Sequence, residues 1–255
     1  MSNDAPSMPA TEAKKDGRQA RWARHNEERR EQIVAAALEV IGESEPGAEV
    51  HVQQIAERAG VNRTVVYRHF AERSDLDIAI QRAIVAQLWA KLLPSVTLEG
   101  TIPEMIERIV GTYVAWAAAN PSLHQVVDRD HGSGVLEQAI DEIAAEIGQV
   151  IVFLLTTLGL EVDLQDDELD ALVHGVVGAV FGAVRRWLDR PERVLTPERL
   201  RVMMSQSAWF LIEGHARSLG VILDPEQPIA DMLARATGLA TGEADLSGLL
   251  ATVAP

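Results

Sequence analysis

The sequence predicts an all-α protein in which a small N-terminal helical domain is followed by a larger helical domain. Apolar residues recur at helical spacing through most of the 255-residue chain, and nothing alternates with period two for long enough to predict a sheet. Proline, glycine and capping residues stand where helices of ordinary length would begin or end. With 47% hydrophobic residues the chain can build a substantial core, and its length suits two domains better than one.

The chain is expected to open with a disordered, basic N-terminal arm over residues 1–25. Residues 1–13 show little pattern, and Lys14–His25 is rich in Lys and Arg. A first helix is predicted from about Glu27 to Glu43, where Pro46-Gly47 breaks the pattern. Its buried stripe is expected to contain Ile33, Ala36, Ala37, Val40 and Ile41.

Two short helices joined by a tight turn are predicted within residues 51–73. Gly60 can end the first helix, because glycine adopts a positive φ at little cost. Asn62 is a favoured N-cap for a second helix, from Arg63 to about Phe70. A glycine-containing turn between two short helices is typical of helix-turn-helix units, which lay the second helix in the DNA major groove.

A fourth helix is predicted to start at Ser74, which forms a capping-box pattern with Asp77, and to stop at Pro94. The boundary between the domains is placed inside this helix. The helix-turn-helix domain then covers residues 26–75, the larger domain residues 76–240, and a flexible tail residues 241–255.

The larger domain is predicted to be entirely helical. Capping residues and prolines indicate helices over 103–120, 122–128, 135–158, 166–189 and 197–220, and a last one that opens with Asp224-Pro225 and runs to about Leu239.

The net charge of −15 is unusual for a protein that binds nucleic acid, but it is unevenly divided. Residues 1–73 hold 11 basic and 12 acidic residues, a net of −1, whereas residues 74–255 hold 12 and 26, a net of −14. The acidity therefore belongs to the larger domain, where it opposes non-specific adhesion to DNA. The sequence has no cysteine, no hydrophobic N-terminal leader and no uninterrupted apolar run of membrane-spanning length, so we expect a cytoplasmic protein.

The stretch IAERAGVNRTVVYRHFAERSDL resembles the signature of the TetR/AcrR family of transcriptional regulators. The similarity lies in an Ile-Ala pair, Ala-Gly-Val, a polar cap and an aliphatic-Tyr-x-His-Phe run, and it covers about 45 residues, from Arg30 to Leu76. The resemblance implies a helix-turn-helix DNA-binding domain followed by a ligand-binding and dimerisation domain. It also implies a homodimeric regulator, most often a repressor that a ligand releases from a pseudo-palindromic operator.

The resemblance implies particular DNA contacts along the second short helix. Arg63 and Thr64 match the family's base-reading positions, and an arginine can bind guanine in a bidentate fashion. Tyr67 and His69 match residues that bind phosphates, which set the register without reading the sequence. Val65 stands where a threonine is usual, so one hydroxyl contact to the backbone is expected to be missing.

Three further positions match DNA contacts outside this helix. Arg73 stands in the place of the family's frequent lysine, and Gln53 stands where some members read a base. His51 stands where a Ser or Thr cap is common; it can donate to a phosphate but caps poorly, which predicts a weaker helix start. In the arm, Arg21 and Arg24 suit entry into the adjacent minor groove, although an ordinary charged tail would look the same.

Small residues recur along the helix predicted over residues 166–189. An interior glycine costs a helix about 1 kcal/mol, so Gly178 and Gly182 indicate that another backbone approaches closely. In the TetR family the matching helix and the next one form a two-fold four-helix bundle. The resemblance therefore implies a homodimer interface that includes Gly178, Gly182 and Trp209, with packing inside one chain as the alternative.

The resemblance also implies a small, largely apolar effector ligand bound between the helices of the larger domain. Side chains of this kind are more often simple core residues, so both readings stay open. The candidate pocket residues are Trp89, Met105, Ile109, Tyr113, Trp116, Leu123, Val127 and Phe153.

No cofactor, metal site or enzymatic activity is expected from the sequence. It contains no nucleotide-binding glycine loop, no nucleophile elbow and no zinc-protease motif. Asp128, Asp130 and His131 stand beside glycines, which indicates a solvated loop rather than a metal site. The alternative of a different class is a helical small-molecule-binding or enzymatic protein whose basic N-terminal module mediates protein contacts.

Overall fold

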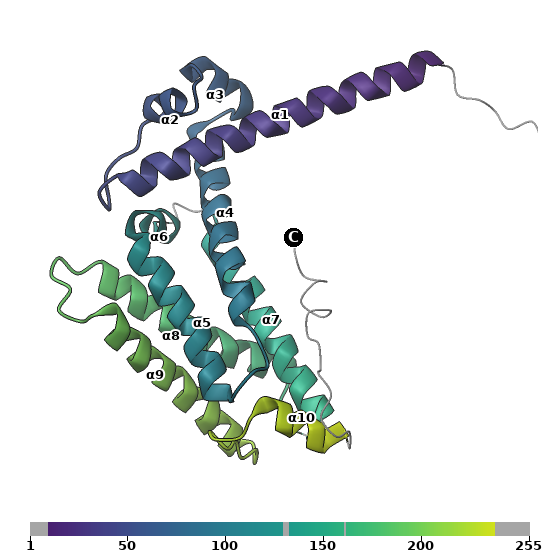
Figure 1. Ribbon diagram of the computed structural model, residues 1–255, viewed down its shortest axis with the longest axis vertical. Coiled ribbons are helices and arrows are strands. Elements are labelled where there is room, and N and C mark those ends of the chain that lie inside the picture. The colour runs from purple at the N-terminus through teal and green to yellow at the C-terminus, as the bar shows by residue number, and fades with distance from the viewer. Residues whose placement is uncertain (1–9, 130–132, 161, 238–255) are drawn as a thin grey trace, which may run out of the picture. The chain divides into compact units, whose positions relative to one another are not determined.

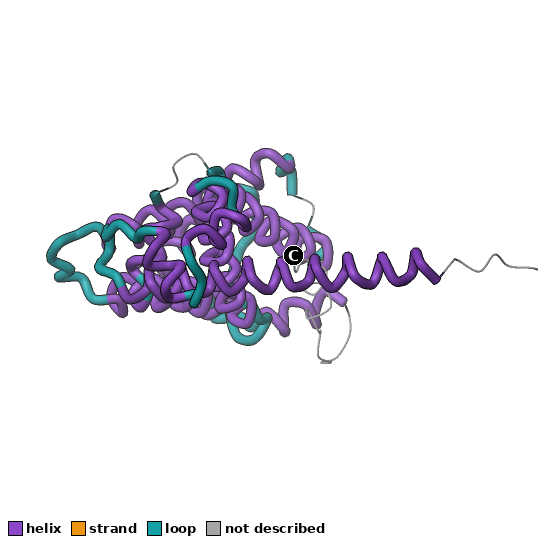
Figure 2. The backbone as a smooth tube through the Cα atoms, turned by 90° about the horizontal axis from the view of Figure 1, so that it is seen from above, coloured by secondary structure: helices purple, strands orange, loops and turns teal. Residues whose placement is uncertain are grey.

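The computed structural model describes residues 10–129, 133–160 and 162–237, without the side chains of residues 10–21, 23, 236 and 237. The chain divides into two compact units, the first ending at Ala83 and the second beginning at Ile84. All regular structure in the described residues is helical, apart from one isolated antiparallel bridge between Thr101 and Pro228 (Figure 2). The all-α class expected from the sequence is confirmed.

The first helix is much longer than the sequence predicts. α1 spans Ala10–Glu43, so the helix takes the place of the disordered arm expected up to residue 25. The residues from Ala10 to Arg30 are mostly Ala, Glu, Lys, Arg and Gln, which are good helix formers, and no proline lies between Pro9 and Pro46. Gly17 alone lowers the helix propensity strongly. The first nine residues lie outside the described part.

In the first unit, α1 packs against α2 (Val52–Arg58) and α3 (Arg63–His69), which Figure 1 shows side by side. The core side chains Ile33, Ile55, Val66 and Phe70 are at most 1% exposed. Side-chain hydrogen bonds, including those from Arg58 of α2 to Glu39 and Glu43, tie α1 to the other helices. Gln32 Nε2 donates to the Ala59 carbonyl at 2.8 Å, and Arg30 Nη1 donates to the His69 carbonyl.

The turn between α2 and α3 has the local geometry that the sequence predicts. Gly60 has a φ of +66°, and Asn62 Oδ1 accepts a hydrogen bond from the Val65 amide at 3.1 Å. The start of α2 is better capped than His51 alone would allow. The His51 amide donates to Gln54 Oε1 at 2.8 Å, so a glutamine three residues later satisfies the helix end.

The helix α4 (Arg73–Leu92) crosses the boundary between the units. The division between the two compact units, after Ala83, falls inside this helix. The capping pair differs from the predicted one, because the Glu72 amide donates to Asp75 Oδ2 at 3.1 Å. One short 3-10 helix, η1 (Leu93–Ser95), follows α4.

The second unit contains α5 (Ile102–Ala119), α6 (Pro121–Asp128), α7 (Val135–Thr157), α8 (Asp166–Leu188), α9 (Pro197–Ser218) and α10 (Ile229–Thr237). α5 packs against α9, α7 packs against α8, and α8 also contacts α9 (Figure 1). α5 begins at a capping box formed by Thr101 and Glu104, one residue before its predicted start. The tail expected over residues 241–255 lies outside the described residues.

α10 begins later than predicted. Asp224-Pro225 opens a turn rather than a helix: the Glu226 amide donates to Asp224 Oδ1 at 2.9 Å, and the Gln227 amide donates to the Asp224 carbonyl at 3.2 Å. Pro228 then precedes the first helical residue, Ile229, whose amide pairs with the Gly100 carbonyl at 2.9 Å. The long-range bond to Gly100 fixes the helix start, and sequence reasoning could not foresee it.

α8 is long and apolar enough to cross a membrane by length and composition alone, and only 17% of its most apolar 18-residue window is buried. The sequence has no uninterrupted apolar run of this length here, because charged residues lie near both ends of the helix. The helix thus presents an unusual amount of apolar surface within the part of the chain that the structure describes.

Candidate nucleic-acid interface

α3 is fixed by its apolar face and presents polar side chains elsewhere. Val66 and Phe70 are 1% exposed and anchor the helix to the first unit's core. The exposed positions of α3 are Arg63, Thr64, Tyr67 and Arg68. A short helix held in this way can enter the major groove with its polar residues foremost.

Arg63 and Tyr67 lie one turn apart on α3 and interact. Arg63 Nη2 donates to the Tyr67 hydroxyl at 3.3 Å, and its Cζ lies 5.4 Å from the centre of the tyrosine ring. This cation–π contact limits the freedom of the guanidinium while leaving it at the surface. The structure therefore brings together a predicted base reader and a predicted phosphate contact.

His69, the last residue of α3, is half-buried. Burial lowers the pKa of its imidazole, and the positive charges of Arg30, Arg29 and His25 lower it further. The buried Nδ1 has no hydrogen-bond partner among the described residues. A neutral imidazole can still donate one N–H to a phosphate, so the predicted role needs no protonation.

Two other predicted DNA contacts already have partners inside the protein. Gln53 Nε2 donates to Glu57 Oε1 at 2.7 Å. Arg73 Nε contacts both carboxylate oxygens of Asp77 at 2.8 and 3.0 Å, and its Nη1 donates to the Val50 carbonyl at 2.9 Å. Arg73 thus ties the start of α4 to the segment before α2, which leaves Nη2 for a phosphate.

The remaining predicted DNA contacts, His51, Arg24 and Arg21, lie outside α3. His51 is exposed, and its Nδ1 lies 3.5 Å from Glu49 Oε1. Arg24 is exposed on α1. The backbone of Arg21 belongs to the same helix, but its side chain lies outside the described part.

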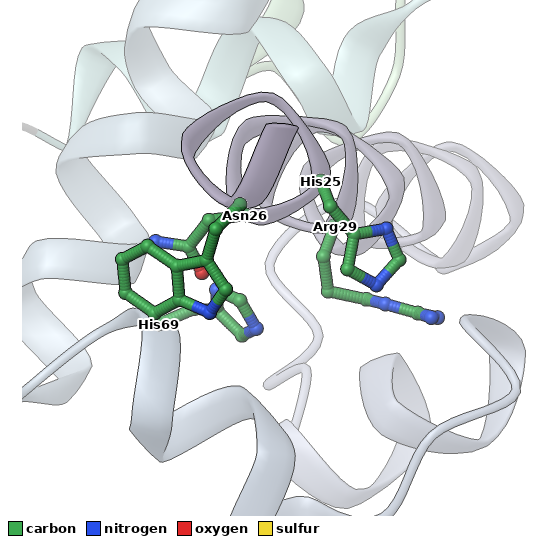
Figure 3. A pocket seen from close by; sticks show the side chains of 5 residues that line it. His25, Asn26, Arg29 and His69 are labelled. Carbon is green, nitrogen blue, oxygen red and sulfur yellow. The ribbon is translucent and has the colours of Figure 1, made fainter. Parts of the chain in front are cut away.

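The sequence did not predict a pocket of about 190 Å³ beside the end of α3. Its lining residues are Trp22, His25, Asn26, Arg29 and His69. Figure 3 shows that His25 and Arg29 project from the same side of α1. The pocket exists because α1 begins well before the predicted start near Glu27. Only a prediction that residues 22–29 are helical could have located it from the sequence.

In the second unit, the predicted interface residues separate into two groups. Gly178 and Gly182 are exposed, and a Cβ at either position would meet nothing within 4 Å. Trp209, by contrast, packs against the hydrophobic core, and its neighbour Phe210 is 66% exposed. On α9 the outward aromatic residue is therefore Phe210.

Most predicted pocket residues contribute to packing in the second unit. Tyr113 belongs to the core, and Trp89, Ile109 and Trp116 pack against it. Leu123 and Val127 are buried on α6, while Met105 and Phe153 are half-buried. Their role in binding an effector stays a prediction.

A polar group lies within this packing. The Tyr113 hydroxyl and His124 Nε2 are 2.9 Å apart, and the His124 ring stacks on Phe181 with 5.3 Å between centroids. Asp128 Oδ1 lies 3.3 Å from Arg185 Nε. Asp130 and His131 lie outside the described residues, which contain no group of three or more metal-ligating side chains.

Residues 33–80, which include the turn and recognition helix described above, match the family model for bacterial regulatory proteins of the tetR family. The first unit therefore contains a TetR-family DNA-binding domain. The protein is a DNA-binding transcriptional regulator, and the TetR resemblance noted from the sequence is confirmed. Its relatives in the comparisons are described as regulators rather than as enzymes.

The similarity to known proteins extends beyond the N-terminal unit. An uncharacterized HTH-type transcriptional regulator of Mycobacterium tuberculosis is 26% identical over 215 residues, which cover 82% of this chain and 88% of the relative. A tetR-family regulator from Streptomyces coelicolor shares the fold with a TM-score of 0.59 and 20% identity, over 89% of this chain and 96% of that one. RolR, crystallised with resorcinol, matches with a TM-score of 0.56 and 17% identity, over 86% and 98%.

Proposed function

We propose that the protein is a homodimeric repressor that a small ligand releases from a pseudo-palindromic operator. The observation that carries the proposal is the exposed polar surface of α3, held in place by Val66 and Phe70. These polar side chains are exposed rather than packed into the core. Their hydrogen-bond donors and acceptors can pair with those that base edges present in a major groove.

The geometry supports a division of labour along α3. Arg63 and Thr64 open the helix and are proposed to read base edges. Tyr67 and His69, nearer its end, are proposed to bind phosphates, which position the helix without reading sequence. His51, Gln53 and Arg73 are proposed as flanking contacts from α2 and the start of α4, and Arg21 and Arg24 as contacts from α1.

The exposed surface of α8 and α9 supports a dimer built on these helices. Gly178 and Gly182 leave open space beside α8, and Met203, Phe210 and Leu211 are 39%, 66% and 39% exposed on α9. Such apolar side chains gain free energy when a second copy covers them. The resulting four-helix bundle would hold two α3 helices about 34–36 Å apart, the spacing of successive major grooves.

The effector is proposed to be small and largely apolar, and to bind in the second unit. The aromatic side chains gathered around Tyr113 favour such a ligand, and the related fold of RolR holds resorcinol. Because α4 contributes Ile80 to one unit and Leu92 to the other, a ligand that displaces α4 would change the spacing of the two α3 helices.

An electrophoretic mobility shift with DNA from upstream of the protein's own gene tests the proposal. We expect a discrete complex whose affinity falls steeply with salt, since phosphate contacts release counterions. Resorcinol and other small aromatic or apolar compounds should then be screened for release. A chain that binds no duplex at low salt would favour the protein-contact alternative and contradict the proposed function.

A further inference from the structure

The pocket at the end of α3 combines one apolar wall with several hydrogen-bond donors. Trp22, His25, Asn26 and Arg29 recur on α1 at spacings of three and four, so they share one face of the helix. His69 closes the pocket from α3 (Figure 3). The Trp22 side chain is 71% exposed, a large apolar surface for an isolated helix face.

The charges around the pocket are mainly positive. Burial lowers the pKa of His69, and the nearby charges of Arg30, Arg29 and His25 lower it further. Glu28 lies 3.8 Å from His25 on the solvent side, and both side chains are more than half exposed. Arg29 Nη1 donates to Gln32 Oε1 at 2.9 Å, a bond that uses one of the five N–H donors of the guanidinium.

We propose that this pocket, formed by Trp22, His25, Asn26, Arg29 and His69, binds a backbone phosphate of duplex DNA. The proposal rests on the proposed function and adds a contact at the end of α3 opposite to Arg63. Six residues separate Arg63 from His69, a rise of about 9 Å along the helix, so the phosphate lies away from the bases that Arg63 reads.

The chemistry of the lining suits a phosphodiester. Arg29 can make charge-assisted hydrogen bonds to two phosphate oxygens, and Asn26 and the two imidazoles supply further N–H donors. The exposed indole of Trp22 offers a flat apolar surface for the adjoining deoxyribose. The positive charges near His69, among them that of Arg29, also attract an anion to the pocket.

The first test measures the salt dependence of duplex binding for the full chain. Arg29→Gln removes one cation but keeps a polar side chain at a half-buried position. We expect the slope of log affinity against log salt to fall by about 0.9, equally on operator and unrelated duplex. Arg82→Gln, at an exposed position of α4 outside the pocket, is the matched control and should leave the slope unchanged. An Arg29→Gln slope equal to that of wild type would overturn the proposal.

The second test uses Trp22 as a reporter. The chain has five tryptophans, and the other four belong to the second unit, so the emission difference between wild type and Trp22→Phe isolates the pocket. We expect duplex DNA to change this difference spectrum saturably, with a stoichiometry of one half-site per chain. Inorganic phosphate, titrated at constant ionic strength, should act only at much higher concentration.

The outcomes separate this proposal from the proposed function. A saturable response to inorganic phosphate without any response to DNA would assign the pocket to a free anion and overturn the DNA contact. Operator binding that Arg63→Ala disturbs but Arg29→Gln leaves intact in slope would also overturn it, while the proposed function stands. Loss of all DNA binding by wild type would instead contradict the proposed function itself.

Discussion

Tyr113 and His124 share a hydrogen bond of 2.9 Å inside the second unit, where α5 meets α6. The two side chains are 8% and 4% exposed. Burial lowers the pKa of His124 to about 4 and raises that of Tyr113. At neutral pH both groups are therefore uncharged, and the hydrogen bond joins a neutral phenol to a neutral imidazole.

This pair predicts acid-dependent stability. Because the folded-state pKa of His124 lies below its unfolded value near 6.5, the unfolded chain binds the proton more readily, and stability falls as the pH drops from about 6.5 to about 4. The loss should be on the order of 3 kcal/mol once protonation is complete. Urea unfolding of wild type and His124→Gln at several pH values checks this. The substitution should flatten the dependence, whereas replacing the exposed His215 with glutamine should not.

His174 predicts the opposite dependence. Its Nε2 lies 3.0 Å from Asp141 Oδ1 on α7, and its Nδ1 lies 2.9 Å from the Asp170 carbonyl on α8. These contacts raise the pKa of His174, so its stabilising effect is complete below the unfolded value and is lost as the pH rises through the folded value. His174→Gln should cost about 1 kcal/mol or less near pH 6, and less still near pH 9. Equal costs at both pH values in thermal unfolding would refute the assignment.

Gly178→Leu should separate the two chains. A Cβ added at this position meets nothing within 4 Å in one chain, so each copy should still fold, but the leucine fills the space where a second backbone would approach. Light scattering should report a monomer with reduced operator affinity. Gly42→Leu adds the same side chain at an equally open position on α1 and should remain dimeric. A tight Gly178→Leu dimer with normal DNA binding would place the interface elsewhere.

Phe210 and its neighbour Trp209 should behave differently. Phe210→Glu places a charge on the exposed face of α9, so we expect dissociation with little change in the stability of each chain. Trp209→Ala removes a side chain packed against the core and should lower stability by about 3 kcal/mol. Comparing unfolding curves with sedimentation of the same two variants distinguishes the roles. If Phe210→Glu stays dimeric, this residue is not at the interface.

Arg63→Ala and Tyr67→Phe should separate base reading from phosphate binding. The first should relax base preference at one position per half-site, at a cost of about 1–3 kcal/mol. The second should weaken operator and unrelated duplex alike, because a phosphate contact carries no sequence information. Since Arg63 donates to the Tyr67 hydroxyl at 3.3 Å, the double variant should lose less than the sum of the two. Binding-site selection that shows unchanged preference for Arg63→Ala would remove it from the base readers.

Much of the first unit could be predicted from the sequence because its determinants are local. Asn62 caps α3 by accepting a hydrogen bond from the amide of Val65, three residues later in the chain. The positive φ of Gly60 depends on that residue alone, because glycine has no Cβ. Most helix boundaries in the second unit were predicted for the same reason. The roles of Arg63 as a base reader and Tyr67 as a phosphate contact were predicted from the family resemblance and do not follow from residue spacing.

The extent of α1 was missed because a basic, low-hydrophobicity stretch satisfies the pattern of a disordered arm and that of a solvated helix equally well. The pocket lined by Trp22 and Arg29 was not predicted for the same reason, because it forms only when that stretch is helical and His69 lies beside it. The start of α10 was missed because the Ile229 amide bonds to Gly100, far away in the sequence.

The sequence by itself determined the helical class, the helix-turn-helix and the family, since these depend on periodicity, caps and turns whose interactions close within a few residues. Tertiary structure decided which apolar side chains are core and which are surface. Trp209 and Phe210 have the same local pattern, and only the packing of α5, α8 and α9 turns one inward and leaves the other exposed. The physical reason is that burial depends on every neighbouring element at once, whereas a capping hydrogen bond depends on one turn of chain.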